Sequence, residues 1–165
     1  IKMRVFKEEQ SFRKWWMFAV LLVNLAVVLI PFFLHDFADA GMNKGLFFAL
    51  AIMAIVYLFI FSSSLHTRID TGGIKTWFTP FNLFRKDLKW SEIDGIYLRK
   101  YNALTEYGGI GVRGLGKSQS YNIGGNTGIQ IEYTQSKKLL IGTRKPSEAQ
   151  SVLNYYQNKI KRHAH

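Results

Sequence analysis

Two uncharged stretches near the start of the chain decide its fold: residues 15–34 read WWMFAVLLVNLAVVLIPFFL, and residues 46–65 read LFFALAIMAIVYLFIFSSSL. Each is twenty residues long, and about 20 helical residues cross the apolar core of a bilayer. Helices of soluble proteins carry a polar face, which neither stretch has. The two stretches therefore predict two transmembrane helices.

The connector between them, residues 35–45, is too short for anything but an antiparallel hairpin. Basic residues mark the cytoplasmic side of a span, so we expect both termini in the cytoplasm. Asn24 is polar within the first span, and it fits a hydrogen bond to the second span, a partner contact or a tolerated polar residue. The flanking basic residues are Lys2, Arg4, Lys7, Arg13 and Lys14 before the first span, and Arg68, Lys75, Arg85, Lys86 and Lys89 after the second.

The composition limits the other classes of function. The 165 residues include 22 basic and 11 acidic side chains, a net charge of +11, and no cysteine. A chain without thiols cannot form a disulfide scaffold, a thiolate metal site or a cysteine-nucleophile enzyme. The positive charge alone fits nucleic acid or an anionic membrane. Because the basic residues flank the spans and fill the domain that follows, we expect membrane lipids and no nucleic acid.

From residue 66 the pattern changes to short alternating runs separated by glycine. Alternation predicts strands over residues 67–70, 74–79, 86–90 and 96–101, and a hairpin over residues 129–141. From Pro146, apolar residues recur at helical spacing and predict a C-terminal amphipathic helix. We therefore divide the chain into an N-terminal segment with the hairpin, residues 1–65, and a cytoplasmic domain, residues 66–165. The fold class is α+β: an antiparallel barrel of six or seven strands with one capping helix.

Two glycine motifs lack the context that their chemistry needs. Residues 111–118, GVRGLGKS, match the phosphate-loop pattern, but that loop requires a helix starting at the lysine. The residues that follow, QSYNIGG, cannot sustain one. The dinucleotide pattern over residues 109–114 likewise lacks a βαβ unit. The four histidines and the scattered carboxylates suggest neither a metal site nor a nucleophile with its base, so we expect no enzyme, no metal and no cofactor.

Basic side chains in and beside the strands are the candidate binding residues. Three arginines within or next to strands would meet an acidic partner if the fold brought them together, and each carries a basic neighbour. The candidates for partner or anion binding are Arg99, Lys100, Arg113, Lys117, Arg144 and Lys145.

Several strings, in their order after two spans, resemble the bacterial pleckstrin-homology-like (PH-like) membrane proteins. The resemblance covers about residues 15–160. It implies a bent antiparallel barrel capped by a helix, a binding or assembly role, and a place in the inner membrane of a bacterium. Eukaryotic relatives often bind inositol phospholipids through a basic first hairpin, whereas here that turn is Thr71-Gly72-Gly73. The strings are TRID at 67–70, WSEI at 90–93, YGG at 107–109, GVRG at 111–114, YN at 121–122 and IGTRKP at 141–146.

The expected function is a non-catalytic, membrane-anchored scaffold, an accessory or assembly subunit of an inner-membrane protein complex that binds other membrane proteins or itself. The alternative is a sensor of anionic lipid headgroups or small anions through the basic residues. A nucleotide-binding protein using residues 111–118 is a remote third.

Overall fold

The computed structural model describes residues 4–34, 40–80, 82–114, 116–134 and 136–163. The chain divides into two compact units. One, here called the helical hairpin, comprises residues 11–63, and the other, the sheet domain, comprises residues 1–10 and 64–165. The expected boundary at residue 65 differs from this division because the first ten residues belong to the sheet domain.

The helical hairpin contains α1, Trp15–Leu34, and α2, Ala40–Ser62. The helices pack antiparallel, with the Phe18 and Phe61 rings stacked at 4.9 Å between centroids. Among the described residues, Lys44–Ser62 is the one stretch that meets the length and hydropathy expected of a membrane span, while the apolar stretch of α1, Trp15–Pro31, is shorter. The connector residues 35–39 lie outside the described residues.

The second uncharged stretch, residues 46–65, does not form a helix over its whole length. The helix ends at Ser62, and β2 begins at Ser64. Leu65 is fully buried in the sheet domain, so its apolar side chain contributes to that core and not to α2. The apolar stretch is therefore divided between a helix and a strand.

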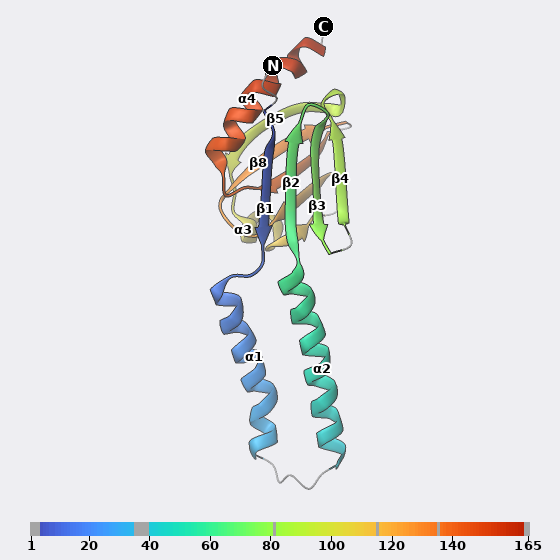
Figure 1. Ribbon diagram of the computed structural model, residues 1–165, viewed down its shortest axis with the longest axis vertical. Helices are drawn as coiled ribbons and strands as arrows, with labels where there is room; N and C mark the ends of the chain where they lie inside the picture. The colour runs from blue at the N-terminus through green and yellow to red at the C-terminus, as the bar shows by residue number, and fades with distance from the viewer. Residues whose placement is uncertain (1–3, 35–39, 81, 115, 135, 164–165) are drawn as a thin grey trace. The chain divides into compact units, whose positions relative to one another are not determined.

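Two sheets form the described part of the sheet domain, with strand orders β1-β2-β3-β4 and β5-β8-β9-β7-β6 (Figure 1). The first holds β1, Phe6–Ser11; β2, Ser64–Asp70; β3, Gly73–Thr79; and β4, Leu83–Lys89. The second holds β5, Ile93–Lys100; β6, Gly111–Arg113; β7, Ser118–Asn122; β8, Thr127–Tyr133; and β9, Lys137–Gly142. The remaining elements are η1, Trp90–Glu92; α3, Ala103–Tyr107; and α4, Pro146–His163.

The predicted hairpins over residues 67–79 and 129–141 are confirmed. β2 pairs antiparallel with β3 from Ser64 opposite Thr79 to Asp70 opposite Gly73, and β8 pairs antiparallel with β9. The α+β class is also confirmed. The antiparallel barrel of six or seven strands is wrong, because the nine strands of the described residues form two sheets that do not close into a barrel, and β7 runs parallel to β9.

Alternating side chains of both sheets build the core. Leu65, Ile69 and Ile74 point inward from the first sheet, and Ile129 and Ile141 from the second, each at most 1% exposed. Such alternation puts one face of each strand inside. The predicted C-terminal helix buries Ala149, Val152, Leu153 and Tyr156, and stacks Tyr156 on Trp90 at 4.8 Å.

Candidate functional site

A glycine-lined cavity of about 610 Å³ contains one of the predicted basic residues, Arg113. Its Nε donates to the Ile110 carbonyl at 3.0 Å, and the guanidinium lies 3.2 Å from where a Cβ on Gly109 would stand. Gly109 has a φ of +134°, so its missing side chain makes room for the arginine. The lining is Tyr101, Asn102, Ala103, Leu104, Gly108, Gly109, Ile110, Arg113, Gly124, Gly125 and Asn126.

Arg99 holds α3 against the second sheet. Its guanidinium donates to Gln130 at 2.9 Å and to the Tyr107 hydroxyl at 3.0 Å, and it pairs with Glu106 at 2.8 Å. Burial is the largest single effect and lowers the pKa of Arg99, but the hydrogen bonds and charge interactions with Glu106 and Tyr107 together outweigh it, so the pKa is raised. Four partners, counting the Lys100 carbonyl at 3.1 Å, commit this side chain to the fold.

The other four predicted basic residues are exposed. Lys100 ends β5, and Lys117 precedes β7. Arg144 donates through Nη2 to the Ile123 carbonyl at 3.4 Å, and Lys145 pairs with Glu148 at 3.5 Å. Arg99, Arg144 and Lys145 thus each have a partner within the sheet domain.

Asn24 connects the two helices of the hairpin. Its Nδ2 donates to the Tyr57 hydroxyl at 3.2 Å and to the Val20 carbonyl at 2.8 Å. The amide thus satisfies the backbone of its own helix and contacts the neighbouring one.

A buried carboxylate that sequence reasoning missed joins the first strand to the segment before α4. Glu8 is 6% exposed and accepts from Thr143 Oγ1 at 2.6 Å and from Arg144 N at 2.7 Å. Beside it, Gln10 Nε2 donates to the Gly142 carbonyl at 2.6 Å. Phe6, Glu8 and Gln10 alternate as the inward-facing residues of β1. Because two of the three are polar, the sequence lacks the apolar alternation that predicts a strand.

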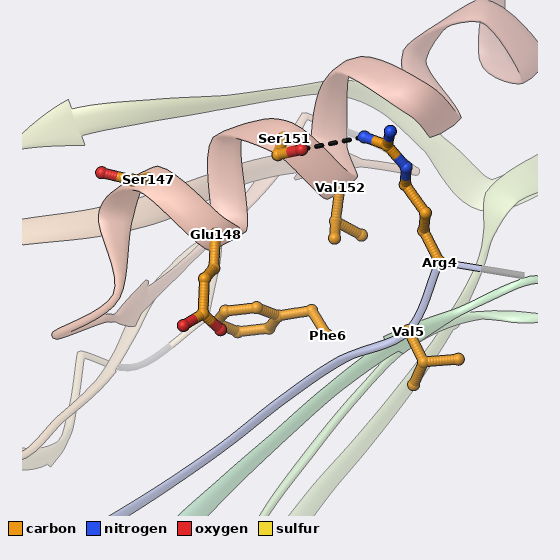
Figure 2. A pocket seen from close by; sticks show the side chains of 7 residues that line it. All are labelled: Arg4, Val5, Phe6, Ser147, Glu148, Ser151 and Val152. Carbon is orange, nitrogen blue, oxygen red and sulfur yellow. Dashed lines mark hydrogen bonds between the residues drawn. The ribbon is translucent and has the colours of Figure 1, made fainter.

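A shallow groove of about 640 Å³ runs between β1 and the first turns of α4 (Figure 2). Figure 2 shows Glu148 beside the Phe6 ring and Arg4 reaching Ser151 across the groove, at 2.9 Å. Arg4 also lies over the Tyr155 ring at 5.9 Å. These contacts attach the start of the chain to the last helix and leave the groove floor apolar.

The phosphate-loop string has the wrong local structure for phosphate binding. Gly111–Arg113 is a strand, and Ser118 begins a second strand where such a loop needs a helix. Leu115 lies outside the described residues. No cluster of His, Asp or Glu suited to a metal occurs among the residues that the structure describes.

Comparisons with family models, with curated proteins and with solved structures found no match to this chain. The class that can be stated is therefore the fold itself, an α+β sheet domain joined to a two-helix hairpin.

Proposed function

We propose that the chain is a membrane-anchored, non-catalytic binding module, an accessory or assembly subunit of a protein complex in the bacterial inner membrane. The observation that carries this proposal is Lys44–Ser62, which has a mean hydropathy of 2.5 and none of its apolar window buried. Side chains such as Leu58, 75% exposed, and Ile55, 68% exposed, would be costly in water. A bilayer removes that cost.

The same proposal makes α1 a second span. Its twenty residues contain no charge, and its hydrogen bond from Asn24 to Tyr57 would satisfy a polar amide away from water. Basic residues precede α1 and follow α2, which favours cytoplasmic termini. The sheet domain would then lie in the cytoplasm.

We further propose that the sheet domain is PH-like. Two sheets with a C-terminal helix packed on β5 and η1 support this proposal, as do the sequence strings that resemble that family. A headgroup-specific sensor is less well supported, because Arg99 and Lys145 already have carboxylate partners. Docking to proteins does not depend on those two charges being unpaired.

Membrane topology is the first test. The chain has no cysteine, so single cysteines at Thr71 and at Lys44 can be labelled in intact cells and in inverted vesicles. We expect a membrane-impermeant maleimide to reach Lys44→Cys only in intact cells and Thr71→Cys only in inverted vesicles. Extraction of the protein by alkaline carbonate would contradict the anchor.

Association is the second test. We expect the protein, expressed at its native level and crosslinked before mild detergent extraction, to purify with other membrane proteins or with further copies of itself. A protein recovered only as a monomer would contradict the assembly role and leave the anchor standing.

A further inference from the structure

Two side chains stand out as the most exposed large apolar groups of the sheet domain among the described residues. Phe84 in β4 is 59% exposed, and Leu104 in α3 is 73% exposed. Phe84 has a φ of +53°, a left-handed conformation that a bulky residue seldom adopts. Leu104 lines the glycine cavity beside Arg113. Neither side chain contributes to the core.

Phe84 lies near the end of the sheet domain at which β2 begins. Ser64, the first residue of β2, follows the last residue of α2 by two positions, which limits their Cα separation to about 8 Å. Ser64 pairs with Thr79, and Leu83 pairs with Phe78 just beyond the turn. Leu83 and Phe84 therefore lie at the end of the first sheet where β2 begins, directly after α2 in the chain.

Leu104 lies at the same end of the sheet domain, which we call the junction end. Gln10, the last sheet-domain residue before the hairpin, donates to the Gly142 carbonyl. The Tyr101 hydroxyl lies 2.8 Å from where a Cβ on Gly142 would stand. α3 begins two residues after Tyr101, and Figure 1 shows α3 and the β3–β4 turn at one end of the sheets.

Basic residues accompany both of these apolar side chains, and Arg113 lines the same cavity as Leu104. Arg85 and Lys86 follow Phe84, and Asp87 nearby is paired with Lys75 at 3.5 Å and Arg85 at 3.8 Å. The carboxylate of α3, Glu106, is engaged by Arg99. We define the junction face as these apolar and basic residues, all exposed except the half-buried Lys86: Phe84, Arg85, Lys86, Lys100, Leu104 and Arg113.

We propose that the junction face docks on the anionic lipid leaflet from which α2 emerges, with Phe84 and Leu104 entering the interface and the basic side chains meeting headgroups. The proposal rests on the membrane anchor proposed above. Two interactions hold proteins on such a surface: insertion of apolar side chains into the interface, and attraction of basic side chains to anionic lipid. The junction face offers both. The Thr71–Gly72 turn, about 20 Å away along β2, would stay in water.

Depth-dependent quenching of the full-length protein tests this docking. Single cysteines replace Phe84, Leu104, Thr71 and Leu58, each carrying a bimane label, in vesicles of phosphatidylethanolamine and phosphatidylglycerol with brominated acyl chains. We expect lipid bromine to quench labels at 84, 104 and 58, and aqueous iodide to quench the label at 71. The double substitution Arg85→Gln and Lys86→Gln should reduce the bromine quenching of the label at 84. We expect the equilibrium constant for docking to fall by about fivefold for each charge removed.

Each other outcome has a distinct meaning. Quenching at 58 without quenching at 84 and 104 overturns the docking and leaves the anchor intact. Loss of quenching at 58 overturns the anchor and the docking together. Labels at 84 and 104 that are shielded from both bromine and iodide would show a protein partner on this face, which also overturns the proposal. Equal quenching at 84 in vesicles of neutral phosphatidylcholine would contradict the role of the basic residues.

Discussion

Glu8 and Thr143, 135 residues apart in the chain, share a buried hydrogen bond of 2.6 Å, and the same carboxylate accepts from Arg144 N. The pair attaches the first strand to the segment that leads into α4. It makes the start of the chain part of the sheet domain.

Replacing Glu8 by alanine should therefore destabilise the sheet domain. Hydrogen bonds to a charged group contribute about 1.5–3 kcal/mol each, and their loss leaves buried donors without partners, so we expect the free energy of unfolding to fall by about 3 kcal/mol. Chemical denaturation of the detergent-solubilised protein measures it. Glu9→Ala is the matched control, since that side chain is 61% exposed. Equal effects of the two substitutions would contradict the buried role.

Tyr101 should make stability depend on alkaline pH. Burial, aided by the nearby Tyr107, raises the pKa of Tyr101 to about 12 against the opposing effect of Arg99. A group with a raised folded pKa contributes fully below its unfolded pKa, about 10, and loses that contribution as the pH rises toward 12. The expected loss is about 2–3 kcal/mol over this window.

The Tyr101→Phe variant isolates that contribution, because lysines and other tyrosines titrate in the same range. We expect the difference in unfolding free energy between the wild type and the variant to change between pH 10 and 12 in favour of the variant. A difference that stays constant with pH would show that the phenol titrates normally in the folded protein.

Gly73 should not tolerate a side chain. Its φ is +143°, and a Cβ there would overlap the Leu88 carbonyl oxygen of the paired strand. We expect Gly73→Ala to lower the free energy of unfolding by about 2–4 kcal/mol. The neighbouring Gly72 is the control, because its Cβ would meet only Asp70 Oδ1 at 3.4 Å; Gly72→Ala should cost less than about 1 kcal/mol. Thermal unfolding followed by circular dichroism distinguishes the two.

The contact between Asn24 and Tyr57 should couple the two helices weakly. Side-chain hydrogen bonds between membrane helices average about 0.6 kcal/mol. A double-mutant cycle of Asn24→Leu and Tyr57→Phe, measured by unfolding in mixed detergent micelles, should return a coupling of that size. Additive effects would mean that Asn24 interacts mainly with the Val20 carbonyl of its own helix.

Local patterns predicted the elements whose inward-facing residues are all apolar. The hairpin over residues 129–141 was predicted because Ile129, Ile131 and Tyr133 alternate, and the last helix because Ala149, Val152, Leu153 and Tyr156 recur at helical spacing. Elements with mixed surroundings were missed. β1 places Glu8 and Gln10 inward, and β7 buries Ser120 and Asn122, so neither shows an apolar alternation. α3 has no buried residue at all.

The predicted binding residues separated for a related reason. Residue type and charge identified Arg99 and Arg113 as equivalent candidates. Packing then gave Arg99 four partners around α3 and placed Arg113 in the glycine cavity. Whether an arginine is paired within the fold depends on neighbours that are distant in sequence, and no local pattern predicts those neighbours.

The sequence by itself determined the uncharged helical stretches, the two β-hairpins, the closing helix and the excess of positive charge, because each follows from the periodicity or composition of adjacent residues. Tertiary structure alone decided that the first strand joins the sheet domain through Glu8, that β7 runs parallel to β9, and that Phe84 and Leu104 share the junction end. Those outcomes depend on pairing between segments far apart in the chain, where hydrogen-bond satisfaction and packing select one arrangement among many that local propensity permits.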